Sequence, residues 1–599
     1  MKAEVKSLKF LSTEGKLVVP FFQRNYVWQQ ENWQGLLNEL LDERNKSIFL
    51  GAIILKELDS SPGVIRTLEI IDGQQRLTTL SILLKALYDT LPQEIKKHIE
   101  YHLLDLLKIR KYDEPSTWEP RLKLSYSDEE AYTQLFENDF KQNYASESLI
   151  IQCYNYFIEE LKKKSINENL KLFNKLLTTE LFVVIYLDKE ENEQFIFDIL
   201  NTTGVRLSLA DLVKSSLYNH YRELLNQIKD SQKTEELDKI FKDLFNKWDN
   251  VFIGNEEALS YWDRTKTMAG ISHDQKFYLL YSIAIIKRIY DPEKHNIDDL
   301  IQLYKNYITN KSLEELKIFI EEIINYANIY REYFKPIDDE TEFSFEDSLD
   351  SSIMRILHIL EKLNIVTFYP FLLFLFKEHK NNKDKIISIL RKIEKLVIRN
   401  AIVGKFSNNY SSLCKEFIED TSKIDKRLAE LTLEEVSKNL RGESGKQLNL
   451  NVAKLLLFWI ELYRRRKNNL QQKLKYEYTL EHIMPINWRQ YWDFKKVPHP
   501  RGDIMSLEEQ EKDRNQKIHW LGNMTLLKSD LNMSIKNFDF SRKMEGERDK
   551  PGIKDLGATL SITKDDIVIP YVMGDKVWNE AKIEARTEKL EKELKEIWG

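Results

Sequence analysis

The chain has 599 residues and a net charge of −6, and 42% of its residues are hydrophobic while 31% are charged. These values exclude a disordered chain and a protein that is basic throughout, and the length predicts roughly three or four domains. The two cysteines, Cys153 and Cys414, are too few for a disulfide framework or a structural zinc cluster. The longest apolar run, residues 365–376, is too short to cross a bilayer, and the N-terminus lacks the apolar core of a signal peptide. We therefore expect a cytoplasmic protein without a membrane partner.

The first part of the chain has the pattern of a mixed α/β domain. Runs of β-branched and apolar residues have the length of strands, and the leucines that follow Asp72 and Gly73 recur at helical spacing. Ser208 and Asp211 have the spacing of a helix cap. The predicted elements are strands at 16–22, 48–55, 64–71 and 181–188, a turn at 60–63 and a helix from residue 74.

From residue 221 to residue 440 the pattern is almost entirely helical. The sequences SLEE at 312–315 and TLEE at 432–435 are typical of helix starts. A polar stretch with two glycines, residues 441–449, is the best candidate linker. We therefore predict an α+β multidomain protein that is predominantly helical. Its predicted domains are 1–220, 221–440 and 450–599.

The sequence YTLEHIMPIN, residues 478–487, places Glu481 beside His482 on a predicted strand. A short strand at 524–527 and a helix with Asn532 in its first turn are predicted downstream, and the start of a helix favours anions. A neutral imidazole can take a proton from water near neutral pH, and a cation held by a carboxylate and an amide oxygen can stabilise a leaving oxyanion. This combination suits phosphodiester hydrolysis with Mg²⁺ or Mn²⁺, which prefer oxygen ligands.

Basic residues flank this pair on both sides. The run LYRRRKNNLQQKLKY, residues 462–476, contains no acidic residue. It is either a solvated helix face or a surface for DNA phosphates, and its position just before the Glu-His pair favours the second interpretation. Downstream, two lysines are predicted on the helix face that carries Asn532. The residues predicted to contact DNA are Arg464, Arg465, Arg466, Lys536 and Lys543.

A second candidate site lies in the sequence IIDGQQRLTTL, residues 70–80. A strand is predicted to end at Asp72 and a helix to begin after Gly73, which leaves backbone N–H groups free beside Arg76. Such a junction binds anions. The neutral side chains of Gln74 and Gln75 suit a sugar or the edge of a base.

The C-terminal motifs resemble a known nuclease family. EHIMP, LGNMTLL and the asparagine, phenylalanine and lysine that follow are similar to the HNH domain, a ββα-metal fold, in the variant found at the C-terminus of GmrSD-type restriction enzymes. The resemblance implies that His482 is the general base, that Glu481 and Asn532 bind the metal, and that Asn523 ties the loop to the strand of the base.

Two features depart from the HNH pattern. The segment between His482 and His519 is longer than a minimal HNH hairpin. In addition, neighbours on a regular strand face opposite sides, so Glu481 and His482 share one site only at a strand end or a bulge. His519 either adds to the site or packs beside Trp520.

The N-terminal motifs resemble the other GmrSD domain. FQRNYVW at 22–28, the G-x-I at 51–53, DGQQRLTTL and the LN-x-x-G loop with Asn201 and Gly204 are similar to a domain with a ParB/sulfiredoxin-like fold that hydrolyses nucleoside triphosphates. The resemblance implies that Asp72 orients a metal or water and that Arg76 acts beside it. The implied nucleotide site consists of Gln23, Arg24, Asp72, Gly73, Gln74, Gln75 and Arg76.

Together the two resemblances imply an NTP-regulated, metal-dependent DNA endonuclease that cleaves modified foreign DNA, as in type IV restriction. Its expected partners are double-stranded phage DNA and a nucleoside triphosphate, and homodimerisation stays open. Glucosylated hydroxymethylcytosine and phosphorothioate are rival targets. The alternatives are a phosphorothioate-sensing nickase of the same architecture, a nucleotide-dependent DNA-binding or signalling protein whose HNH fold does not cut, and an enzyme that acts on RNA.

Overall fold

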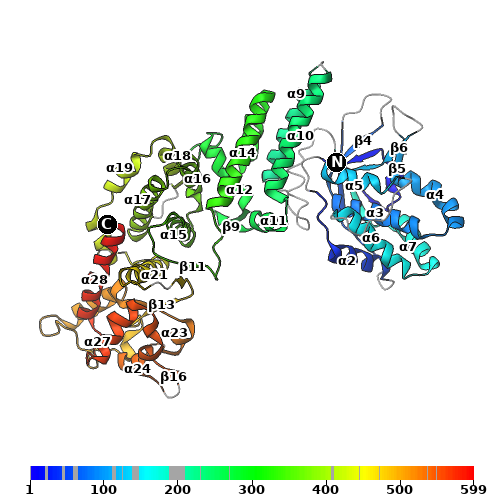
Figure 1. Ribbon diagram of the computed structural model, residues 1–599. Helices are drawn as coiled ribbons and strands as arrows, with labels where there is room; N and C mark the ends of the chain where they lie inside the picture. The colour runs from blue at the N-terminus through cyan, green and yellow to red at the C-terminus, as the bar shows by residue number, and fades with distance from the viewer. Residues whose placement is uncertain are drawn as a thin grey trace. The chain divides into compact units, whose positions relative to one another are not determined.

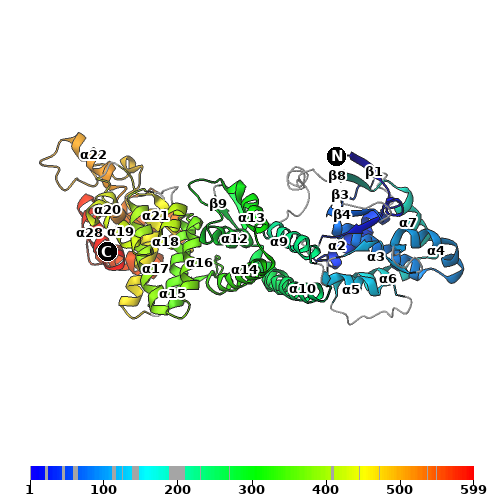
Figure 2. The same cartoon turned by 90° about the horizontal axis from the view of Figure 1, so that it is seen from above.

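The computed structural model of the protein describes residues 2–20, 25–42, 48–58, 65–110, 117–124, 126–137, 148–187, 209–228, 231–268, 270–405, 410–443, 446–470, 473–535, 537–547 and 550–599. The chain divides into two compact units, Met1–Lys229 and Asp230–Gly599 (Figure 1 and Figure 2). The fold is mixed α+β and mostly helical, as the sequence predicts. None of the helices in the described ranges combines the length and the apolar character that a membrane crossing needs.

The N-terminal unit contains strands and helices in alternation. Its elements are β1 (Lys2–Lys6), α1 (Phe10–Thr13), β2 (Lys16–Val18), α2 (Gln30–Leu41), β3 (Ala52–Glu57), β4 (Thr67–Asp72), α3 (Gln74–Thr90), α4 (Gln93–Leu107), β5 (Lys108–Arg110), β6 (Trp118–Pro120), β7 (Leu122–Lys123), α5 (Tyr126–Gln134), α6 (Leu149–Lys162), α7 (Ile166–Thr178), β8 (Phe182–Leu187) and α9 (Leu209–Asn226).

A six-stranded mixed sheet organises this unit, with the strand order β1-β8-β3-β4-β2-β7. β8 pairs antiparallel with β1 and parallel with β3, and β4 pairs antiparallel with β3 and parallel with β2. The four predicted strands are β2, β3, β4 and β8. All four differ in their bounds from the prediction, and the differences are largest for β2 and β3. β2 ends at Val18, two residues before Pro20, which has no N–H for a ladder, and β3 begins only after Gly51, where φ is +99°.

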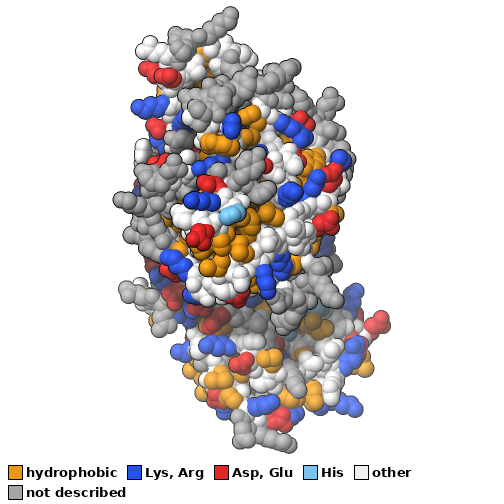
Figure 3. Space-filling model, turned by 90° about the vertical axis from the view of Figure 1, so that its right-hand side faces the viewer, with side chains coloured by type: hydrophobic (Ala, Val, Ile, Leu, Met, Phe, Trp, Pro, Cys, Tyr) orange, Lys and Arg blue, Asp and Glu red, His pale blue; other side chains and the backbone are white. Residues whose placement is uncertain are grey.

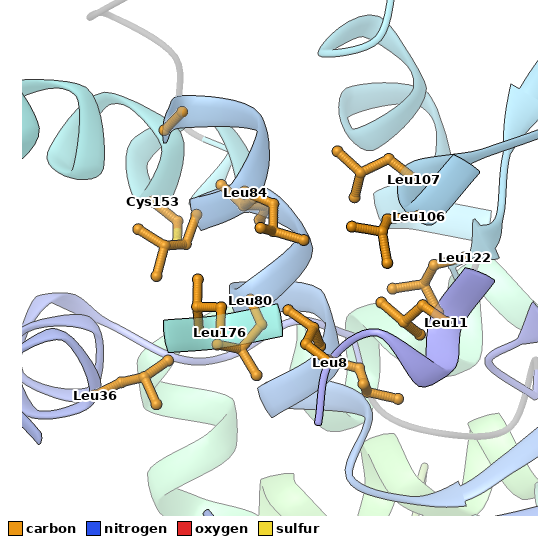
Figure 4. Close-up of a cluster of buried hydrophobic side chains, with 14 of the residues drawn as sticks. Leu8, Leu11, Leu36, Leu80, Leu84, Leu106, Leu107, Leu122, Cys153 and Leu176 are labelled. Carbon is orange, nitrogen blue, oxygen red and sulfur yellow. The ribbon is translucent and has the colours of Figure 1, made fainter. Parts of the chain in front are cut away.

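Helix α3 lies in the core of this unit and packs against α6. Leu77, Leu80, Leu84 and Leu87, the face predicted from the sequence, are all buried. Each buried leucine stabilises the fold by about 1.5–3 kcal/mol. The start of α3, which follows Asp72 and Gly73, is therefore held in a fixed place at the end of β4. Figure 4 shows α3 leucines among apolar side chains from other elements, including Leu8, Leu36, Leu106, Leu122, Cys153 and Leu176.

The C-terminal unit begins with a helical region. Its elements are α10 (Ser231–Ile253), α11 (Glu256–Trp262), β9 (Thr265–Met268), β10 (Ile271–Asp274), α12 (Gln275–Ile286), η1 (Ile297–Asp299), α13 (Leu300–Thr309), α14 (Leu313–Tyr333), β11 (Glu342–Phe343), α15 (Leu349–Lys362), η2 (Val366–Phe368), α16 (Tyr369–Glu378), α17 (Lys383–Ile402), α18 (Tyr410–Glu419), α19 (Lys423–Ala429) and α20 (Leu433–Leu440). Two predicted helix starts are confirmed, because Ser312 and Thr432 accept hydrogen bonds from the N–H groups of Glu315 and Glu435.

The end of the chain forms shorter elements between two long helices. They are α21 (Leu450–Lys467), β12 (Leu474–Lys475), β13 (Thr479–His482), η3 (Trp488–Gln490), α22 (Leu507–Lys517), η4 (Leu521–Asn523), β14 (Met524–Leu527), α23 (Ser529–Ile535), α24 (Phe540–Glu545), β15 (Gly546–Glu547), β16 (Lys550–Pro551), α25 (Ile553–Leu556), η5 (Gly557–Thr559), α26 (Ser561–Thr563), the π-helix η6 (Lys564–Val568), α27 (Ile569–Val572) and α28 (Glu580–Trp598).

These last elements pack onto the helical region within one compact unit. Helix α28 contacts α17 and α20, and the guanidinium of Arg399 donates to the carbonyl oxygen of Trp598 at 3.1 Å. Strand β12 pairs with β11, and α21 packs against α15. The predicted separation of 221–440 from 450–599 stays a prediction, because contacts within this unit join the two ranges.

Candidate functional site

Strands β13 and β14 form a short antiparallel ladder, and α23 follows β14 directly. Glu481 pairs with Thr525, and His482 pairs with Met524 as the last residue of the ladder. His482 therefore lies at a strand end, which is one of the two places where it could share a site with Glu481.

Asn523 fixes the turn before β14 to the chain that leaves β13. Its buried amide nitrogen donates to the carbonyl oxygens of Met484 at 2.8 Å and Ile518 at 2.9 Å. Its amide oxygen accepts from the N–H of Met484 at 2.9 Å and from the indole N–H of Trp578 at 3.1 Å. The side chain thus holds the backbone directly after His482 in one position. A role of Asn523 in the reaction itself stays a prediction.

Asn532 reaches from α23 to the strand that carries the Glu-His pair. Its amide nitrogen donates to the hydroxyl of Thr479 at 3.0 Å and to the carbonyl oxygen of Leu480 at 3.1 Å. Its amide oxygen is therefore the atom that could face a cation.

Glu481 is engaged by a lysine. The ammonium group of Lys543 contacts the Glu481 carboxylate at 2.5 Å and donates to the carbonyl oxygen of His482 at 2.8 Å. Burial raises the pKa of Glu481, and Lys543 opposes this shift. Burial likewise lowers the pKa of Lys543, and Glu481 opposes that shift. The pair is thus a desolvated contact between two side chains and one backbone carbonyl, at the centre of the predicted site.

The position of Lys543 corrects a prediction. Helix α23 ends at Ile535, and Lys543 belongs to the separate helix α24, which begins after the cap Asp539. Lys543 does not share the helix face of Asn532, and its side chain is fully buried. It is therefore bound to Glu481 rather than presented to DNA. Lys536 lies outside the described residues.

The imidazole of His482 has a free polar atom. Its Nε2 is buried and has no hydrogen-bond partner in the described structure. Burial, with smaller contributions from His519 and Lys543, lowers the pKa of His482 to about 4. The ring of His519 lies edge-on to it, with centroids 6.3 Å apart. His482 is thus neutral at pH 7 and carries a nitrogen that can accept a proton.

The predicted cation ligands fit an oxygen-preferring metal only in part. Glu481 and Asn532 come from adjoining elements and offer oxygen atoms. In the described ranges, however, no three residues of the types His, Cys, Asp and Glu form a group that could hold a metal ion. The ammonium group of Lys543 also occupies one of the two oxygens of the Glu481 carboxylate.

The predicted nucleotide site lies where β4 ends and α3 begins. Gly73 has a φ of +95° and occupies the cap position, so the chain turns directly from the strand into the helix. Arg76 donates to the carbonyl oxygen of Leu50 at 2.5 Å and lies 3.4 Å from the Asp72 carboxylate. Both side chains of this pair keep part of their surface exposed. Gln74 is at the first helical position, and Gln23 and Arg24 lie outside the described residues.

Gln75 has a different role from the predicted one. Its amide oxygen accepts from the N–H of Val27 at 3.0 Å, and its amide nitrogen donates to the carbonyl oxygen of Asn25 at 3.0 Å. The side chain is buried. Gln75 therefore positions the chain that follows Arg24, and it does not line a ligand site with its own polar atoms.

Gly51 supports this site in a way that sequence reasoning missed. Its φ of +99° is unfavourable for other residues, and an added Cβ would lie 2.0 Å from Nη1 of Arg76. The close approach lets Arg76 cross the backbone and reach Leu50. The only signal in the sequence was the G-x-I motif, which gives no reason for the glycine.

The surface on the side of the N-terminal unit shows no continuous patch of one charge among its described residues (Figure 3). Acidic, basic and apolar side chains are interspersed there.

The arginines of the basic run also correct a prediction. Arg464 binds the carboxylates of Asp566 and Glu593, with N–O distances of 2.9–3.1 Å, and Arg465 binds Glu461 at 2.7 Å. Both arginines are buried. Arg466 is exposed but contacts the carboxylate of Asp347. Arg464 and Arg465 thus tie α21 to its own unit instead of facing DNA phosphates.

Comparison with known proteins gives two family matches. The family model described as "GmrSD restriction endonuclease, N-terminal domain" matches residues 7–218. The one described as "GmrSD restriction endonucleases, C-terminal domain" matches residues 431–593. A relative named "Uncharacterized protein MJ0686", from Methanocaldococcus jannaschii, is 24% identical over 238 residues, which is 34% of this chain and 40% of the relative. The chain thus spans less than half the length of that relative.

Proposed function

Because this chain belongs to the GmrSD restriction endonuclease family, we propose that it hydrolyses phosphodiester bonds of DNA at β13, β14 and α23, with His482 as the general base. We assign the ββα-metal HNH fold to these three elements and the ParB/sulfiredoxin-like fold to the N-terminal unit. The observation that carries the proposal is the neutral imidazole of His482, whose Nε2 has no partner among the described residues.

The role of each side chain follows from its contacts. His482 takes a proton from the attacking water at Nε2, and its low pKa keeps that nitrogen unprotonated at pH 7. An approaching phosphate raises this pKa, because a nearby negative charge favours the imidazolium form. Asn523 keeps the backbone after His482 fixed while the proton moves.

We propose Mg²⁺ or Mn²⁺ as the cofactor, held by Glu481 and Asn532. Such a cation would stabilise the charge of the leaving oxyanion. Lys543 contacts Oε1 of this carboxylate, so the cation would bind the other carboxylate oxygen or displace the ammonium group.

The test is cleavage of phage DNA by the full-length protein with metal and a panel of nucleoside triphosphates. We expect His482→Ala to lower the rate of cleavage by about 10²- to 10⁴-fold, the usual contribution of a general base. His379→Ala, which alters a histidine after α16, is the matched control and should cut at the wild-type rate. Full cleavage by His482→Ala would refute the assignment.

The N-terminal unit is proposed to bind and hydrolyse a nucleoside triphosphate that regulates cutting. The support is the junction at Gly73 and Gln74, where a helix start and the Arg76 guanidinium adjoin. Arg76→Gln should abolish NTP hydrolysis, whereas Arg66→Gln, directly before β4, should leave it unchanged. Hydrolysis that survives Arg76→Gln at the wild-type rate would refute this site.

Modified foreign DNA is the proposed substrate class, and cleavage of glucosylated and phosphorothioate DNA would separate the two rival targets. One observation favours the second candidate, a DNA-binding protein that does not cut: Lys543 occupies the carboxylate that a metal would need. Gel-shift binding without cleavage under every metal and nucleotide, unaffected by His482→Ala, would support it.

A further inference from the structure

Two lysines from different helices converge on one tyrosine ring. Lys362 is the last residue of α15, and its Nζ lies 5.1 Å from the centroid of Tyr476. Lys454, on α21, has its Nζ 4.3 Å from the same centroid. Tyr476 lies between β12 and β13. We refer to Lys362, Lys454 and Tyr476 as the lysine–tyrosine cluster.

Neither lysine of this cluster has an acidic partner in the described structure. Other lysines of this unit do, as Lys266 does with Glu361 and Lys475 with Glu340. The aromatic ring compensates two like charges only weakly, because a cation–π contact contributes about 0.5–2 kcal/mol. The positive charge of Lys362 also lowers the pKa of Lys454, after the larger effect of burial. An anion bound here would therefore reduce the electrostatic repulsion between the two ammonium groups in the folded protein.

The ring itself has rigid support. His358 is fully buried, and its ring meets Tyr476 edge-on with centroids 4.6 Å apart. Phe458 also meets the ring of Tyr476 edge-on, with centroids 4.9 Å apart. Burial, followed by Lys362 and Lys454, lowers the pKa of His358 to about 3, so no third positive charge competes for the site. The two ammonium groups are thus displayed on a fixed aromatic platform.

We propose that the lysine–tyrosine cluster binds the phosphodiester backbone of the substrate DNA. The inference rests on the proposed nuclease function. Tyr476 precedes His482 by six residues, which span at most about 22 Å of extended chain. Since DNA rises 3.4 Å per base pair, a phosphate on the cluster lies within about six base pairs of the scissile bond. The cluster therefore fixes how the duplex is placed against β13.

The test measures binding apart from cutting. A plain DNA duplex of about 30 base pairs is titrated with the full-length protein in EDTA, between about 50 and 200 mM salt. The double variant Lys362→Gln/Lys454→Gln should bind about tenfold more weakly or worse, and the slope of log K against log salt should fall by about 1.8, or 0.9 for each lost phosphate contact. The charge-preserving variant Lys362→Arg/Lys454→Arg should retain most of the slope.

The matched control alters two exposed lysines that have acidic partners. Lys392 pairs with Asp425 and Lys438 with Glu434. Lys392→Gln/Lys438→Gln removes the same charge and should leave the slope unchanged. An unchanged slope in the cluster variant, or an equal fall in the control, overturns the inference.

The outcomes also separate this inference from the nuclease function. If the wild type cuts, His482→Ala does not, and the cluster variant keeps the wild-type slope, then only the DNA-binding role of the cluster fails. If the wild type neither binds nor cuts DNA, then the proposed function fails with it. His482→Ala should bind with the wild-type slope, because its change lies outside the cluster.

Discussion

The basic run on α21 and the lysine–tyrosine cluster, which includes Lys454 of the same helix, use their charges in opposite ways. Arg464 and Arg465 are buried and bound to carboxylates of their own unit. Lys362 and Lys454 have no acidic partner in the described ranges and are held against a tyrosine. The first group looks more basic in the sequence, but only the second has charge left for a ligand.

Positive charge has two roles in these two regions, internal cohesion in the first and availability to a ligand in the second. A buried guanidinium between two carboxylates contributes to cohesion, and losing it leaves those carboxylates uncompensated. An unpaired ammonium group adds little to stability but interacts strongly with a polyanion, because each phosphate contact releases a counterion. The number of arginines in a stretch is therefore a poor measure of DNA binding, and the number of unpaired cations is a better one.

The largest effect is expected for Arg464→Met. The side chain joins Asp566 and Glu593, and the variant leaves both without one of their cations. We expect the free energy of unfolding to fall by about 3–5 kcal/mol, the usual result of breaking a buried pair, while the salt dependence of DNA binding stays the same. Urea denaturation and anisotropy titrations check the two parts.

The control for this change is Arg466→Gln. Arg466 contacts Asp347 at the surface, and such pairs contribute about 0–1 kcal/mol. If Arg466→Gln lowered the free energy of unfolding as much as Arg464→Met, the buried arginine would have no special structural role. If Arg464→Met lowered the salt dependence of DNA binding, Arg464 would be in contact with DNA.

The next effect concerns the arginine of the N-terminal unit. Gly51→Ala places a methyl group where Nη1 of Arg76 lies, and it imposes a side chain on a φ of +99°. We expect a loss of about 1–3 kcal/mol of stability together with loss of NTP binding. Thermal unfolding and nucleotide binding measure both quantities. Gly270→Ala, where φ is +83° but the added Cβ meets nothing within 4 Å, isolates the backbone strain from the displacement of Arg76.

Much of the fold could be predicted from the sequence because local patterns determine it. Four of the strands of the first unit, the helix after Gly73 and the caps at Ser312 and Thr432 follow from residue types and spacing. The strand–strand–helix order around His482 was predicted for the same reason. Its bounds were less accurate, since α23 ends at Ile535 instead of continuing to Lys543.

The partners of charged residues could not be predicted from spacing. Asp566 and Glu593 lie about a hundred residues or more from Arg464, and only tertiary packing brings them together. The same holds for Lys543, which reaches Glu481 from a different helix. The lysine–tyrosine cluster draws on three distant segments and has no motif. Burial and pairing, which decide whether a charge is available, are properties of the folded chain.

A smaller effect is expected for His358→Leu, which tests the support of the lysine–tyrosine cluster. Both ring nitrogens of His358 are buried without partners in the described structure, so an apolar side chain should raise stability at pH 7 by about 1 kcal/mol. The pKa of His358 falls from 6.5 to about 3 on folding, so the native state binds fewer protons than the unfolded state between these values. Wild-type stability is therefore lost as the pH falls below 6.5, and the variant lacks this loss.

The advantage of His358→Leu should grow by about 1.4 kcal/mol for each pH unit below 6.5. Urea denaturation at pH 7, 6 and 5 measures it. An advantage that does not change with pH would mean that His358 is protonated in the native state. In that case it would add a third positive charge to the cluster.

The smallest change in stability is expected for Asp72→Asn. The Asp72–Arg76 pair is neither buried like that of Arg464 nor unpaired like Lys362, because both side chains keep part of their surface exposed and lie 3.4 Å apart. The variant should lose less than about 1 kcal/mol, since solvent screens the pair and Arg76 keeps its bond to Leu50. If Asp72 orients water or a metal at the nucleotide, NTP hydrolysis should nevertheless fall by about 10²-fold or more while nucleotide binding persists. Denaturation, binding and hydrolysis on one preparation separate these quantities. A large loss of stability would mean that the Asp72–Arg76 pair is structural, like the ion pairs of the buried arginines. Unchanged hydrolysis would mean that Asp72 has no role in the reaction.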